Sequence, residues 1–160
     1  MNSLNIVLFE PEIPQNTGNI VRTCAATGVA LHLIKPLGFS MKDRYLKRAG
    51  LDYWKLVDIF TYESLEEFSN SHPNGHMAFL TKHAERTYDA IELSAPLFLI
   101  FGRETAGLPG RFLSEQPDKC YRIPMVREAR SLNLSNAAAI VIYDVLRRSG
   151  YAGLKREGTQ

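Results

Sequence analysis

The sequence has few cysteines and no long apolar run, and its first ten residues do not resemble a secretory leader; each observation argues against a class of protein. Its two cysteines, Cys24 and Cys120, lack the spacing of a metal site. No apolar run approaches the ~20 residues of a membrane span, and the run at residues 97–101 has the length of a buried strand. Residues 1–10 lack a basic segment followed by a long apolar stretch. We therefore expect a cytoplasmic protein with reduced thiols and no membrane partner.

Metal ligands are also scarce. His72 and His76 stand four residues apart, but Pro73 and Gly75 between them argue against a helix that would align the two rings. The other two histidines, His32 and His83, have no matched ligand spacing. The sequence therefore predicts no metal centre.

Charge is nearly balanced over the whole chain, with a formal net charge of +2, but the basic residues are clustered. Four of them lie within residues 42–48, opposed by Asp43 alone, and Arg122, Arg127 and Arg130 form a second group. Such clusters suit a polyanion such as RNA. For any one cluster, an ordinary solvated surface is the simpler interpretation.

Short apolar runs alternate with amphipathic stretches over the whole chain. The predicted strands cover residues 4–9, 30–34, 56–60, 77–81, 97–101 and 121–123, and the predicted helices cover residues 16–27, 42–48, 64–70, 109–115 and 133–149. This alternation is typical of βαβ units. A length of 160 residues fits one domain. We expect a single α/β domain over residues 1–160, with a mainly parallel sheet flanked by helices.

The first segment that differs from simple scaffold is residues 10–22, directly after the first predicted strand. Ligands of open α/β sheets bind at the carboxyl ends of strands, where this segment begins. Asn16 can cap a helix or bind a polar group, and Arg22 follows Asn19 by about one helical turn. A fixed guanidinium suits a phosphate or a developing oxyanion. A capped helix with a solvated arginine is an equally good interpretation of this segment alone.

The second segment is residues 97–109, where a wholly apolar strand runs into Gly102, Glu104 and Gly107. Glycines after a buried strand allow backbone amides to approach a ligand. The segment matches neither the P-loop nor the Rossmann glycine pattern. A nucleotide-like ligand and a simple strand-to-helix turn both remain open.

The third segment, residues 121–136, places hydroxyl and amide side chains before the last apolar helix. Ser131 or Asn133 could be the N-cap, while Ser135 and Asn136 would follow in the first turn. One cap does not explain four such residues. The surplus indicates hydrogen bonding to a ligand near a helix N-terminus.

Taken together, the three segments resemble the three motifs of the SPOUT methyltransferases. Within that superfamily the sequence is similar to the minimal tRNA 2′-O-methyltransferases of the TrmL/YibK type. The counterparts are residues 16–22 (NTGNIVR), 101–108 (FGRETAGL), and 123–125 (IPM) with 130–136 (RSLNLSN). The similarity continues through most of the chain, including residues 11–16 and 49–53. Members often have proline at position 103, arginine at 106 and methionine at 132, where this chain has Arg103, Ala106 and Leu132.

The resemblance implies properties that the residues alone do not. It implies a C-terminal trefoil knot, a homodimer in which both subunits contribute to each active site, and S-adenosylmethionine as methyl donor, with no metal. It implies that the acceptor is the ribose 2′-hydroxyl of the cytidine or uridine at the wobble position, in the anticodon stem-loop of leucine tRNAs. Two other functions remain open: methylation of a base nitrogen or of another RNA, and RNA binding without catalysis.

The resemblance also assigns roles to residues. The catalytic set is Arg22, Glu104, Ser131 and Asn133. The cofactor-binding set is Leu80, Thr81, Gly102, Gly107, Ile123, Met125, Ser131 and Leu132. The RNA-binding set is Asn16, Arg22, Arg44, Lys47, Arg48, Arg130 and Tyr143. Arg22 is the base in some family mechanisms, but a guanidinium hardly deprotonates in a protein. We expect it instead to orient RNA and stabilise the developing alkoxide. Packing at a subunit interface is an equal alternative for Tyr143.

Overall fold

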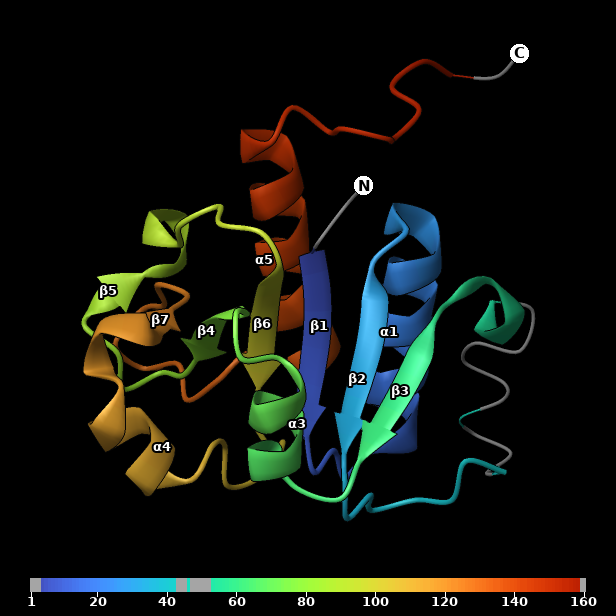
Figure 1. Cartoon of the computed structure of the whole chain (residues 1–160). Coiled ribbons are helices and arrows are strands. Elements are labelled where there is room, and N and C mark those ends of the chain that lie inside the picture. The colour runs from blue at the N-terminus through green and yellow to red at the C-terminus, as the bar shows by residue number, and fades with distance from the viewer. Residues whose placement is uncertain (1–3, 43–45, 47–52, 159–160) are drawn as a thin grey trace.

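A parallel sheet forms the centre of the molecule (Figure 1). The computed structural model describes residues 4–42, 46 and 53–158. The strands are β1 (Leu4–Phe9), β2 (Ala30–Ile34), β3 (Ile59–Tyr62), β4 (His76–Leu80), β5 (Arg86–Thr87), β6 (Leu97–Phe101) and β7 (Cys120–Arg122). They lie in the order β3-β2-β1-β6-β4-β7-β5, and every pair is parallel. The predicted α/β class with a mainly parallel sheet is confirmed.

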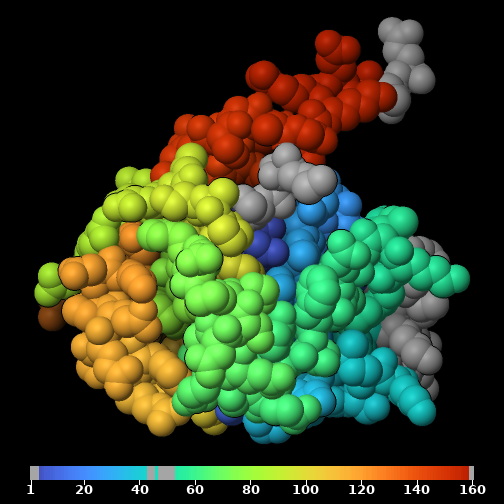
Figure 2. Space-filling view, in the orientation of Figure 1, coloured from blue at the N-terminus to red at the C-terminus, as the bar shows by residue number. Residues whose placement is uncertain are grey.

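Helices cover both faces of this sheet. They are α1 (Pro14–Thr27), α3 (Leu65–Ser71), α4 (Gly110–Glu115) and α5 (Leu134–Arg148), with short 3₁₀ turns at Trp54–Leu56, Tyr88–Ala90 and Pro117–Lys119. In Figure 1, α1 and α5 lie behind the sheet, and α3 and α4 lie in front of it. None of the described helices has the length and apolar character needed to cross a bilayer. The last described residues project from the body beyond α5 (Figure 2).

Alternation along the central strands explains the two layers. Ile6 and Leu8 of β1 pack with α1 and α5, whereas Val7 and Phe9 pack with Phe68 of α3. Successive side chains of a strand point to opposite faces, so a strand covered on both sides must be apolar throughout. All five residues of β6 are buried, which is why its limits could be predicted without error.

Two predictions for the edges of the sheet differ from the structure. The strand predicted at residues 56–60 lies instead at Ile59–Tyr62, and residues 54–56 form a 3₁₀ turn. The position of β3 is set by its pairing with β2, in which Leu31 lies opposite Ile59. Strand β5 was not predicted, because a strand of two residues is too short to show a periodic pattern of apolar side chains. The predicted helix 42–48, with Arg44, Lys47 and Arg48, falls largely outside the described residues.

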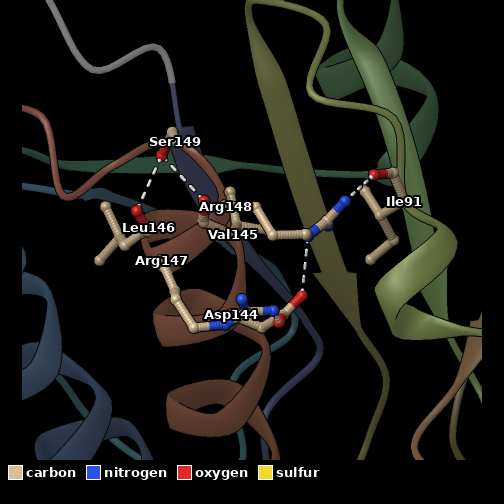
Figure 3. A network of polar contacts seen from close by, with 7 residues as sticks. All are labelled: Ile91, Asp144, Val145, Leu146, Arg147, Arg148 and Ser149. Carbon is tan, nitrogen blue, oxygen red and sulfur yellow. Dashed lines mark hydrogen bonds and ion pairs between the residues drawn. The ribbon is translucent and has the colours of Figure 1, made fainter.

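The end of α5 is tied to the segment that precedes β6 (Figure 3). Arg148 donates from Nε to Asp144 Oδ2 at 2.9 Å and from Nη1 to the carbonyl oxygen of Ile91 at 2.7 Å. Arg147 donates to the other carboxylate oxygen of Asp144 at 2.9 Å. The Asp144 side chain is only 10% exposed, because both of its carboxylate oxygens are paired with these two arginines.

A partly buried polar chain joins three neighbouring strands to the end of α3. His32 Nε2 lies 3.3 Å from Asn5 Oδ1, and His32 Nδ1 lies 3.0 Å from the Tyr62 hydroxyl oxygen. That hydroxyl lies 3.1 Å from His72 Nε2. Because Asn5 Oδ1 can only accept, His32 Nε2 donates to it and Nδ1 accepts from Tyr62, which in turn accepts from His72. The chain is complete when both histidines are neutral.

Acid should therefore destabilise the protein through this chain. Burial, with a smaller contribution from His72, lowers the pKa of His32 from 6.5 to about 4, and burial also lowers the pKa of His72. A lowered histidine pKa contributes stability that is present above pH 6.5 and is lost as the pH falls towards 4. For His32 the loss should reach roughly 3 kcal/mol. Urea unfolding at pH 7.5, 5.5 and 4.5 measures it.

Two variants identify the source of this pH dependence. His32→Gln should be less stable at pH 7.5 but should lose less stability on acidification than the parent. His83→Gln removes an exposed histidine and should leave the pH dependence unchanged. An unaltered pH dependence in His32→Gln would show that other groups are responsible.

Candidate functional site

A cavity opens where three strands of the sheet end. Leu80 is the last residue of β4, Gly102 directly follows β6, and Ile123 directly follows β7. The parallel sheet brings these three strand ends to one edge. Together with the start of α1 and of α5 they surround a cavity of about 810 Å³.

The predicted cofactor residues all line this cavity, although they come from four separate segments. They are Leu80, Thr81, Gly102, Gly107, Ile123, Met125, Ser131 and Leu132. Four other predicted site residues, Asn16, Glu104, Arg130 and Asn133, line it as well. Their assembly in one place is an observation about geometry, and their chemical roles remain predictions.

The floor of the cavity is a tight loop over residues 102–107. The backbones of Arg103 and Gly107 form two hydrogen bonds, of 3.2 and 2.9 Å. Gly107 has a φ of +67°, which favours glycine. At Gly102, an added Cβ would stand 2.2 Å from the carbonyl carbon of Gly107 and 2.3 Å from the nitrogen of Leu108. Only glycine at position 102 therefore permits this closed loop.

A chain of hydrogen bonds joins the three motif segments at the cavity wall. Glu104 accepts from the backbone nitrogens of Glu12 at 2.8 Å and Ile13 at 3.1 Å, and from Asn16 Nδ2 at 3.2 Å. Asn16 Oδ1 in turn accepts from Asn133 Nδ2 at 2.9 Å. Both oxygens of the Glu104 carboxylate are thus engaged with the start of α1. This geometry fits a residue that positions the wall of the site.

The N-terminus of α5 faces the same cavity. Asn133 is its N-cap, and its Oδ1 accepts from the backbone nitrogens of Ser135 at 2.9 Å and Asn136 at 3.3 Å. Of the two caps that the sequence left open, the structure selects Asn133. Ser131 and Leu132 precede this cap and are exposed at the cavity. A helix N-terminus there favours a polar or anionic ligand.

Two predicted site residues lie away from the cavity of their own chain. Arg22 is exposed on α1, with its guanidinium 5.1 Å from the centre of the Tyr53 ring. It stands six residues after Asn16, about 9 Å along the helix axis. Tyr143 is 45% exposed on α5, which packs beside α1. Neither is among the described residues that line the cavity.

Comparison with known proteins identifies the family of this chain. The model of the SpoU rRNA Methylase family matches residues 3–143. The chain belongs to this family. A Geobacillus stearothermophilus relative is 54% identical over 155 residues, covering 95% of this chain and 99% of that protein. The Yersinia pestis tRNA (cytidine(34)-2′-O)-methyltransferase is 47% identical over 156 residues, covering 94% and 96%.

Solved structures agree with this family assignment. One that is described as giving structural insights into the 2-OH methylation of C/U34 on tRNA has a TM-score of 0.87 at 39% identity, covering 92% of this chain and 97% of that chain. An AdoMet-bound rRNA methyltransferase from Sinorhizobium meliloti has a TM-score of 0.82 at 26% identity. The match covers 91% of this chain and 56% of that chain. The expected methyltransferase class is confirmed, whereas the trefoil knot stays a prediction.

The residues of the cavity fit S-adenosylmethionine. A volume of about 810 Å³ lies within the usual range of small-molecule sites, ~300–1,000 Å³. Leu80, Ile123 and Leu132 offer apolar surface for a purine. Among the described residues, no group of three or more possible metal ligands occurs.

Some residues of the site were not predicted. Ile13, Lys82, His83 and Leu113 also line the cavity. Lys82 and His83 directly follow the predicted Thr81, so their place after the end of a strand was the feature that could have identified them as site residues. Glu12 contacts Thr105, a residue that lines the cavity and lies 93 residues away in the sequence. In the sequence, only Pro11 and Pro14, on either side of Glu12, indicated a fixed backbone conformation at this point.

Proposed function

We propose that this protein transfers a methyl group from S-adenosylmethionine to the ribose 2′-hydroxyl of the wobble cytidine or uridine in tRNA. The observation that carries this proposal is the joining of all three motif segments around one cavity, in a chain that belongs to the SpoU methylase family. The names of the similar proteins supply the acceptor position.

The described residues supply binding and orientation for this reaction. When bound, the cofactor would supply a methyl group on sulfonium and leave as S-adenosylhomocysteine. The protein aligns the 2′-oxygen with this methyl group, and the hydroxyl proton passes to water or to an RNA phosphate. Alignment can contribute roughly 7–11 kcal/mol in well-oriented systems. Arg22 holds RNA and stabilises the developing alkoxide. Glu104 and Asn133 fix Asn16 between them, and Ser131 closes the cavity.

We assign tRNA contact to exposed basic residues near the cavity and along α1. Arg130 lines the cavity, and Lys82 at the end of β4 adds a second cation there. Arg44, Lys47 and Arg48 complete the predicted set outside the described residues. Phosphate contacts of this kind make binding dependent on salt. The anticodon stem-loop of leucine tRNAs is the proposed substrate, and the cytoplasm, where tRNA is processed, is the proposed location.

We further propose that the protein acts as a homodimer through the exposed faces of α1 and α5. Ile140 is 38% exposed and Tyr143 is 45% exposed, one turn apart on α5. Ala26 lies exposed on the neighbouring α1, which also presents Arg22. Apolar residues on two adjacent helix faces suit a second copy of the same surface. Such a dimer would explain why Arg22 lies away from the cavity of its own chain.

The experiment that tests the function uses total tRNA and radiolabelled S-adenosylmethionine. We expect label in 2′-O-methylcytidine or 2′-O-methyluridine after digestion, and transfer to purified leucine tRNAs and to their isolated anticodon stem-loops. Label on a base nitrogen would support the alternative enzyme class. RNA binding without methyl transfer, and without any affinity for the cofactor, would overturn the proposal in favour of a binding protein. Light scattering tests the dimer.

A further inference from the structure

Three successive residues of the cavity floor are bonded to one short segment before α1. Arg103 Nε lies 3.2 Å from the carboxylate of Glu10, and Glu104 accepts from the backbone nitrogens of Glu12 and Ile13. In the other direction, the backbone nitrogen of Thr105 donates to the Glu12 carboxylate. The floor loop and the start of α1 thus hold each other reciprocally.

Glu12 also contacts the loop through its side chain. Its carboxylate accepts from the backbone nitrogen of Thr105 at 3.0 Å and shares the one proton of the Thr105 hydroxyl, whose oxygen lies 2.8 and 2.9 Å from the two carboxylate oxygens. Hydrogen bonds to an ionised acceptor are roughly twice as strong as neutral ones. This Glu12–Thr105 latch joins two segments that are 93 residues apart.

The backbone of Glu12 is itself fixed from the other side. The nitrogen of Gly38 donates to the carbonyl oxygen of Pro11 at 2.9 Å. An added Cβ at Gly38 would stand 2.7 Å from the Glu12 Cα and 2.8 Å from its carbonyl oxygen. The close approach of these two backbones fixes the main chain from which the Glu12 side chain reaches Thr105.

We propose that Glu12 is a positioning residue for methyl transfer, which acts by holding the cofactor floor against the helix that carries Arg22. Glu12 is not among the described residues that line the cavity, so it acts through Thr105 and the 102–107 loop. Ile13 and Asn16, which directly follow it, do line the cavity. The latch therefore sets the position of the cofactor relative to α1. This inference rests on the proposed function.

The test separates this role from a merely structural one. Glu12→Ala and Thr105→Val should each raise the Kd for S-adenosylmethionine, measured by calorimetry without RNA, by about tenfold. Each should also lower kcat with total tRNA, while the KM for tRNA changes little. Thr105→Ser keeps the hydroxyl and should restore cofactor affinity. Glu66→Ala, which removes an exposed carboxylate paired with Arg111, is the matched control.

The double variant decides the mechanism. If the two residues act as one latch, Glu12→Ala combined with Thr105→Val should be no worse than either alone. Additive effects would overturn the proposal, as would a fall in Tm with an unchanged Kd and kcat. The comparison of Thr105→Val with Thr105→Ser keeps the test valid should Glu12→Ala fail to fold. Because the calorimetry needs no tRNA, an error in the proposed substrate leaves this result interpretable.

Discussion

Replacing Gly102 with alanine should raise the Kd for S-adenosylmethionine by about 100-fold or more and abolish methyl transfer. The added Cβ would lie 2.2 Å from the backbone of Gly107, far inside van der Waals contact. The obstructing atoms are backbone atoms of the same loop, so no side-chain rotation relieves the clash. The loop would have to open and lose the paired hydrogen bonds between Arg103 and Gly107. Calorimetry with the purified variant measures the affinity.

Gly110 provides a control from the same region. It also lines the cavity, but an added Cβ there meets no protein atom within 4 Å. As the first residue of α4, it should accept alanine readily. Gly110→Ala should therefore leave the free energy of unfolding within about 0.5 kcal/mol of the parent, whereas Gly102→Ala should lower it. Normal affinity in Gly102→Ala would show that the closed loop is not the cofactor floor.

Much of the fold was accessible from the sequence because the central strands are apolar on both faces. The limits of β1, β2 and β6 agree with the prediction, since their residues face buried layers on both sides. The outer strands gave weaker signals. Strand β3 pairs on one side only, and its register depends on β2 rather than on its own pattern. Strand β5 is a two-residue strand that exists through its pairing with β7.

The cavity could be predicted for a related reason. Its walls are loops that directly follow apolar strands, and glycine, serine and asparagine gather in those loops. Contacts between the loops left no such signal. The partner of Glu12 is 93 residues away, and the partners of His32 lie on other strands. Their side chains meet because of strand order, which neither composition nor periodicity reveals. Nothing in the sequence indicated where Arg22 lies relative to the cavity.

Replacing Arg22 with alanine should lower kcat with tRNA by about 100- to 1,000-fold, the usual effect of removing a group that stabilises a developing oxyanion. Cofactor affinity should be unchanged, because Arg22 is not among the described residues that line the cavity. Arg22→Lys should remain strongly impaired, since an ammonium keeps the charge but loses the planar pair of donors. Arg111→Ala, which also removes an exposed guanidinium, should retain turnover. Full activity in Arg22→Lys would contradict both the orienting and the base role.

Mixing two inactive variants should show on which subunit Arg22 acts. A dimer of one Arg22→Ala chain and one Gly102→Ala chain has an intact cofactor cavity on the first and an intact arginine on the second. If each active site combines the cavity of one chain with Arg22 of the other, this heterodimer contains one complete site.

Random exchange at equal amounts should then restore about a quarter of the parent activity per chain, because half of the dimers are mixed and each has one working site of two. If Arg22 serves its own cavity, every site in the mixture lacks a part and no activity should return. The position of Arg22, about 9 Å along α1 from Asn16 and on an exposed face beside α5, favours the first outcome.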